Sequence, residues 1–195
     1  MAHPQLGLYI NTVAPTDTAV SLAEVKSHLK ISASTEDTYL TNLISVATEM
    51  VQNYTGQVLM PTTQSLKLPY FINRMDIQRV PVKTVVITYY DSDNISTTLA
   101  STDYEALLTL SSTDSPVAST IIAASGVSFP DTYPRMDAVT ITFTSGYDDA
   151  DAVPMALKQA MLLIIGQLFL NRSDMVYKMP VLSEYLLNPY KIAVL

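Results

Sequence analysis

Apolar residues recur at helical spacing over residues 35–55. They lie three or four positions apart and leave a polar back, which predicts an amphipathic helix. Ser34 or Thr35 is placed to cap this helix, and Gly56 is suited to end it in a left-handed conformation. The apolar stripe consists of Leu40, Leu43, Ile44, Ala47, Val51 and Tyr54.

A shorter helix is predicted at about 22–30. Ser21 followed three residues later by Glu24 is the pattern of a capping box. Leu22, Val25 and Leu29 then fall on one helical face.

From about 62 to 147 the helical period is absent, and alternation with a period of two replaces it. In DAVTITFTSGY, apolar Val139, Ile141 and Phe143 alternate with threonines, which predicts a half-buried strand. We expect six or so short strands in an antiparallel β-rich insertion. The turns between them are expected at 91–94, 111–116 and 130–134.

The segment VPMALKQAMLLIIGQLFLNR predicts a helix at 154–171 that is apolar on nearly every face. It is short for a bilayer and contains Lys158, so we interpret it as the central helix of a small bundle rather than a membrane span. The apolar surface that the other helices leave uncovered must then meet the β insertion or another subunit. The candidates for core and subunit contact are Met155, Leu162, Ile165, Leu168 and Phe169.

These elements predict an α+β fold in which helices flank a β insertion. We expect one structural unit, with a last short helix at about 181–188. Its parts are an N-terminal arm (1–20), a helical core (21–56 plus 152–188), a β-rich insertion (57–151) and a C-terminal tail (189–195).

The charge is uneven along the 195 residues. The net charge is −7, and a basic face for nucleic acid is not expected. Residues 1–151 hold 7 Lys/Arg and 16 Asp/Glu, whereas residues 152–195 hold 4 and 2. The mildly basic C-terminal part indicates docking through that end, unless the difference is ordinary scatter of surface charge.

The residues that carry chemistry are sparse. The chain has no cysteine and two histidines, His3 and His28, and no phosphate-binding loop motif is present. We therefore expect no cofactor, no metal site and no catalytic set, and the N-terminus lacks the apolar run of a signal peptide. Asp148, Asp149 and Asp151 are interpreted as the acidic start of the following helix rather than as cation ligands.

The order and spacing of these segments resemble the tailed-bacteriophage head–tail connector (adaptor) family, of the gp6-like and gp15-like type with a β insertion. The resemblance covers about residues 20–192. The pieces that carry it best are YTGQVLMPTTQ after the second helix, TSGY followed by VPMALKQA before the third, and NPYK near the end.

The resemblance implies a structural virion protein at the neck, made in the bacterial cytoplasm. Copies would form a ring below the portal, twelve to match it, extend the DNA channel without binding DNA specifically, and hold a tail-side connector or tail protein. It also implies that the C-terminal segment reaches the portal. The residues expected to dock there are Tyr185, Leu186, Leu187, Tyr190 and Lys191.

Two other functions remain open at this stage. One is a different tail-completion or baseplate protein that binds its partner through the β insertion. The other is an enzyme with carboxylate chemistry, which would have to gather the scattered Asp and Glu residues in one pocket. The irregular segment 115–136 is either a contact loop or an ordinary surface loop.

Overall fold

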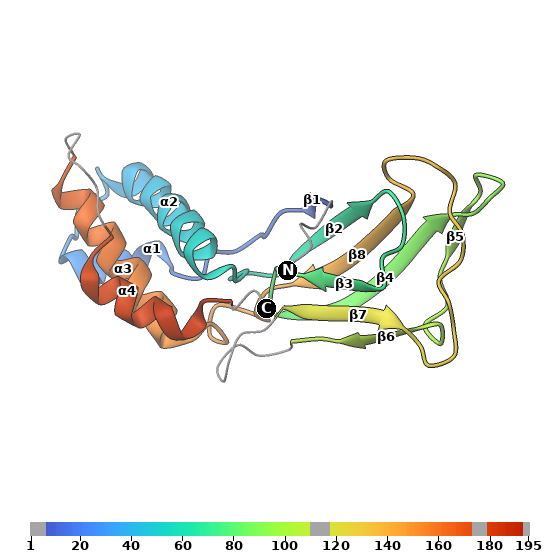
Figure 1. Cartoon of the computed structure of the whole chain (residues 1–195). Helices are drawn as coiled ribbons and strands as arrows, with labels where there is room; N and C mark the ends of the chain where they lie inside the picture. The colour runs from blue at the N-terminus through green and yellow to red at the C-terminus, as the bar shows by residue number, and fades with distance from the viewer. Residues whose placement is uncertain (1–6, 110–117, 173–178, 193–195) are drawn as a thin grey trace.

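The computed structural model describes residues 7–109, 118–172 and 179–192. This part of the chain is elongated, with the helices at one end and the strands at the other (Figure 1). We call these two ends the helical body and the β body. The helical body contains α1 (Leu22–Leu29), α2 (Asp37–Thr55), α3 (Met155–Leu170), α4 (Val181–Leu187) and the 3₁₀ turn η1 (Asn188–Tyr190).

The predicted capping box is present at the start of α1. The backbone N–H of Glu24 donates to Ser21 Oγ (3.2 Å), and the Glu24 carboxylate accepts from the Ser21 backbone N–H (2.7 Å) and hydroxyl (2.7 Å). The two hydrogen bonds that the carboxylate accepts lower the pKa of Glu24, the one from the Ser21 backbone N–H most, and the charge of Lys158 on α3 lowers it further. The cap therefore favours the ionised carboxylate.

We expect Ser21→Ala to lower the free energy of unfolding by about 1 kcal/mol at neutral pH. Because the pKa of Glu24 is depressed in the folded state, the carboxylate's contribution is present above its unfolded pKa and is lost as the pH falls through the folded pKa. The difference between the variant and the wild type should therefore shrink in acid. Urea denaturation of both proteins at neutral pH and below about pH 4 measures this. A difference that stays constant with pH would show that the carboxylate takes no part.

The apolar stripe predicted for α2 faces the interior. Its residues are buried except Tyr54, which is half-buried, and α2 is capped by Gly56, whose φ of +78° is the left-handed conformation expected for it. A side chain at this position would be strained. The sequence pattern and the structure agree here because only one face of the helix is buried, and that face sets the spacing of the apolar residues.

The start of α2 differs from the prediction. The cap position is Glu36, which makes no side-chain capping bond, and neither Ser34 nor Thr35 serves as the cap. Ion pairs to other elements hold the first turn instead. Asp37 contacts a lysine of α1 (2.7 Å), and Glu36 contacts Arg172 beyond the end of α3 (3.0 Å).

The central position predicted for the apolar helix is confirmed, since α3 packs against α1, α2 and α4. Pro154 precedes the helix and is not its first residue, because its ψ of 134° is extended. The α3 side chains in the core are Leu157, Ala160, Met161, Ile164 and Ile165.

The β body consists of two antiparallel sheets that share one core. Five strands pair in the order β1-β2-β8-β4-β5, and three in the order β3-β7-β6. The predicted alternation in β8 is confirmed, because Val139, Ile141 and Phe143 are buried between the sheets. The strands are β1 (Leu8–Val13), β2 (Thr62–Leu68), β3 (Arg74–Ile77), β4 (Val82–Tyr90), β5 (Ser96–Thr98), β6 (Tyr104–Leu107), β7 (Ser119–Ala123) and β8 (Val139–Ser145).

The N-terminal arm contributes a strand that the sequence pattern did not predict. Residues 8–13 form β1, which pairs with β2 at the edge of the larger sheet. Tyr9 anchors it, because its ring packs edge-on against Phe143 and its hydroxyl accepts from the Gln78 N–H (3.1 Å). Burial raises the pKa of Tyr9, so its phenol stays neutral at physiological pH. The predicted turn at 111–116 lies within residues that the structure does not describe.

Gln57 joins the two bodies at their junction, which we call the waist (residues 56–61 and 146–153). Its side chain is fully buried. The amide oxygen accepts from the Tyr147 hydroxyl (2.7 Å), and the amide nitrogen donates to the Tyr190 carbonyl (2.7 Å). One side chain thus links the end of α2, the start of the connection to α3, and the segment after α4.

Candidate interaction surfaces

The clearest unpartnered apolar surface of the helical body lies on α4. Val181, Leu182 and Tyr185 are each between 58% and 71% exposed, although the helix has only seven residues. They occupy positions i, i+1 and i+4, which lie on neighbouring sides of a helix. The opposite side of α4 is buried against α3, where Ser183 contacts the Ala160 carbonyl (3.5 Å). We call the three exposed residues the α4 face.

The five residues expected to dock on the portal have different environments. Tyr185 is part of the α4 face, and Lys191 is exposed. Leu186 and Tyr190 are half-buried, whereas Leu187 is fully buried in the helical core. Val181 and Leu182 were not among the expected residues, because a seven-residue helix has too few positions to show which side faces inward.

The segment after α4 is held against the end of α2. The backbone N–H of Ile192 donates to the Thr55 carbonyl (2.9 Å), and the Tyr54 hydroxyl donates to Asn188 Oδ1 (2.8 Å). The Lys191 ammonium lies 5.1 Å from the centre of the Tyr54 ring, within the range of a cation–π contact. Up to Ile192, therefore, the C-terminal segment packs on its own chain.

The residues proposed on α3 for core and subunit contact differ in how far they are buried. Ile165 is fully buried in the core of its own chain, and Leu162, Leu168 and Phe169 are half-buried against that core. Met155, at the first turn, is 74% exposed. Met155 is therefore the member of this set most available to another chain.

The aspartates before α3 serve local structure. Asp149 Oδ1 accepts from the backbone N–H of Ala152 (2.8 Å), and Asp148 pairs with Lys83 of β4. His28 is exposed on α1. Among the described residues, no three His, Asp or Glu side chains come together in a way that could hold a metal ion. Within the same residues, no helix is both long and apolar enough to cross a membrane.

The comparisons with known proteins agree with this architecture. A family model described as phage gp6-like head-tail connector protein matches residues 19–122. No curated protein matches the chain. Among solved structures, a chain from the virion of a native gene transfer agent particle superposes with a TM-score of 0.79 at 22% identity, over 96% of this chain and 97% of that one.

Two neck structures of such particles have the same fold. A chain from the neck of the empty particle, with C6 symmetry, has a TM-score of 0.78 and 21% identity. A chain from the neck of the native particle, with C12 symmetry, has a TM-score of 0.73 and 22% identity. Each alignment covers 96% of this chain and 97% of the other, so the helical body and the β body are matched together.

Proposed function

The chain belongs to the phage gp6-like head-tail connector family, whose model covers more than half of its residues, and from this premise we propose that it is a ring-forming neck protein that docks on the portal through its helical body. Proteins of this family are structural, and the proposed role requires no catalytic group. The neck structures that contain chains of this fold were computed with C6 and C12 symmetry, which supports a symmetric ring, and we propose twelve copies.

The α4 face carries the proposal for the portal contact. Three large apolar side chains on one short helix are exposed to water, which is unfavourable unless another chain covers them. Aromatic residues such as Tyr185 contribute strongly to interfaces, because they bury a large area at a small cost in conformational entropy. We assign the docking to the α4 face, with Lys191 and the segment beside it, and leave Leu187 to the core.

The contact between copies is assigned to the exposed start of α3. In a closed ring each copy uses two different patches, one toward each neighbour. Met155 supplies an exposed apolar residue on one of them, next to the half-buried apolar side of α3. The net charge of −7 is compatible with a channel along which DNA moves without adhering.

Native mass measurement and negative-stain imaging of the protein, alone and mixed with the portal of the same particle, test this function. We expect a ring in the mixture. Tyr185→Asp should weaken the association with the portal at least about tenfold, because it places a charge at the centre of the apolar contact. The side chain is 71% exposed, so the fold should tolerate the change.

Ile95→Asp is the matched control, since Ile95 is an exposed apolar residue in the β4–β5 turn of the β body. It should leave portal affinity within about twofold of the wild type. A wild-type protein that stays monomeric and ignores the portal would refute the function. Equal portal affinity of Tyr185→Asp and the wild type would refute only the assignment of the α4 face.

A further inference from the structure

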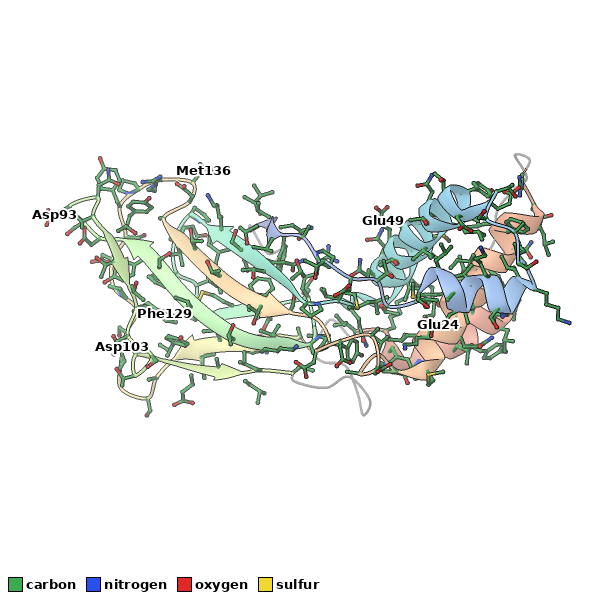
Figure 2. The ribbon with its side chains drawn as sticks, turned by 180° about the vertical axis from the view of Figure 1, so that it is seen from behind. Glu24, Glu49, Asp93, Asp103, Phe129 and Met136 are labelled. Carbon is green, nitrogen blue, oxygen red and sulfur yellow. The ribbon has the colours of Figure 1, made fainter. Side chains whose placement is uncertain are left out.

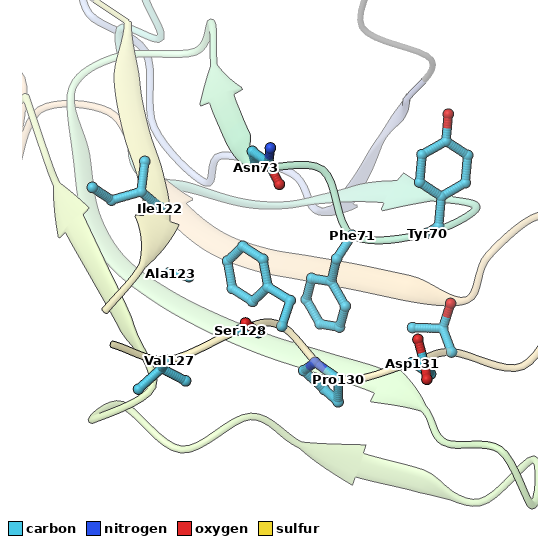
Figure 3. A pocket seen from close by; sticks show the side chains of 11 residues that line it. Tyr70, Phe71, Asn73, Ile122, Ala123, Val127, Ser128, Pro130 and Asp131 are labelled. Carbon is cyan, nitrogen blue, oxygen red and sulfur yellow. The ribbon is translucent and has the colours of Figure 1, made fainter. Parts of the chain in front are cut away.

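A groove with an aromatic floor lies in the β body, beside the loop that joins β7 to β8. Its volume is about 450 Å³, within the range of roughly 300–1,000 Å³ typical of ligand sites. Figure 3 shows Ile122 of β7 at one end and Tyr70, after β2, at the other. The loop residues Val127 to Asp131 form one wall. The groove therefore combines two regions that are far apart in the sequence, residues 70–73 and 122–132.

The floor of this groove is rigid. The rings of Phe71 and Phe129 stack with their centres 4.7 Å apart and their planes 9° from parallel, and Tyr89 packs edge-on against Phe71 (5.5 Å). Both phenylalanines are packed against the core of the β body. The stacked rings offer a preformed apolar strip, which reduces the cost of ordering a bound segment, whereas the exposed lining of the groove as a whole is more polar than apolar.

The apolar residues around the floor are open to water. Tyr70, Ile122 and Val127 are between 38% and 50% exposed. Exposed apolar residues that line a concave surface mark an interaction site more specifically than apolar residues scattered singly. With a volume of about 450 Å³, the groove admits an extended segment or a few side chains rather than a broad flat surface.

The surroundings of the groove are acidic. Asp131 lies in its wall, and Glu105 of β6 pairs in register with Ile122, which also lines the groove. Within the described ranges, Asp131 and Glu105 take part in no ion pair. Unpaired carboxylates near one opening attract a cationic partner.

The basic residues near the groove are already engaged. Arg135 contacts Asp137 (2.6 Å) and stacks on the Tyr90 ring (3.7 Å). Arg74, next to the groove residue Asn73, contacts Asp76 (2.9 Å). Neither guanidinium is therefore free to neutralise the carboxylates at the opening, and the local field stays negative.

We propose that this groove is the docking site for the tail-side neck protein, which inserts an aliphatic or aromatic side chain next to a lysine or arginine. The apolar side chain packs on the Phe71–Phe129 stack, and the basic group pairs with Asp131 at the wall. This assignment rests on the proposed neck function. The chemistry of the partner follows from complementarity to an apolar floor with an acidic rim.

The position of the groove suits a connector. It lies in the β body, whereas the α4 face lies in the helical body at the other end of the long axis (Figures 1 and 2). Both partners can therefore be held at once without competing for surface. The same chain would contact the head through helices and the tail through loops of a sheet.

Binding of the purified tail-side neck protein of the same particle, to the full-length chain alone and to its complex with the portal, tests this proposal. We expect Asp131→Lys and Val127→Ser each to weaken that binding at least about tenfold. Affinity should fall as salt is raised, since surface charge attraction is screened. Peptides tiled along the tail-side protein should bind only where a basic residue adjoins an aliphatic or aromatic one.

Asp93→Lys and Val86→Ser are the matched controls, because Asp93 is an exposed acid that does not line the groove and Val86 is an exposed valine on β4. Both should bind within about threefold of the wild type. The proposal would be overturned if both groove variants bound as strongly as the wild type, or if peptides without basic residues bound. It would also be overturned if the wild type failed to bind both alone and in its complex with the portal. Portal association is measured in parallel. A protein that still binds the portal but not the tail-side protein refutes the groove assignment and leaves the neck function intact.

Discussion

Gly146→Ala is expected to destabilise the protein by about 3 kcal/mol or more. Gly146 follows β8 at the waist and has a φ of +105°, a conformation that side chains rarely adopt. A Cβ at this position would lie 2.3 Å from the carbonyl oxygen of Met60 and 2.5 Å from its carbonyl carbon. Both atoms belong to the backbone, so no side-chain rotation relieves the overlap. Urea denaturation of the variant measures the loss.

Gly126→Ala separates the two causes of this effect. Gly126 also has a positive φ, +79°, but a Cβ there would meet nothing within 4 Å. Only the cost of the left-handed conformation remains, about 1 to 2 kcal/mol. If the two alanine variants lose equal stability, the close approach of Gly146 to Met60 is not a determinant of the fold.

Gln57→Leu is expected to cost about 2 to 3 kcal/mol. The side chain is fully buried, and leucine preserves much of its volume while removing both hydrogen bonds of the amide. The Tyr190 carbonyl loses its donor, and Tyr147 loses one of its hydrogen bonds. Hydrogen exchange should also quicken at the Ile192 amide, which bonds the Thr55 carbonyl at the same junction.

Gln64→Leu is the control for this experiment. Gln64 of β2 is also a buried glutamine, but its Oε1 has no hydrogen-bond partner among the described residues, and its Nε2 bonds only the exposed Asn11 (2.8 Å). Removing an unsatisfied buried acceptor should be near neutral in stability. A loss as large as that of Gln57→Leu would show that glutamine volume, and not the bridge across the waist, accounts for the effect.

The fold was predicted best where one face of an element is buried. The stripe of α2, the shared face of α1 and the alternation of β8 followed from the period of the apolar residues. The period could not show which side of α3 faces outward, because that helix is apolar all round. β1 was missed since its stability comes from Tyr9 reaching a distant sheet.

The candidate surfaces were harder to predict from the sequence. Tyr185 was identified, but Leu187 on the same helix belongs to the core, and only tertiary packing distinguishes the two. The groove combines residues near 71, 122 and 129, and their sequence neighbours do not reveal that they meet. The irregular segment 115–136, left open between a contact loop and a surface loop, supplies one wall of it from its described part.

The return of the N-terminal segment to the β body has a mechanical consequence. Because β1 lies in the larger sheet while α1 and α2 lie in the helical body, the backbone passes between the bodies before α1, after α2 and again before α3 (Figure 1). A tensile force along the long axis is therefore shared by three covalent tethers in parallel, and no single linker bears it. A connector in the neck of a particle benefits from such a joint, since extension requires several tethers to yield together.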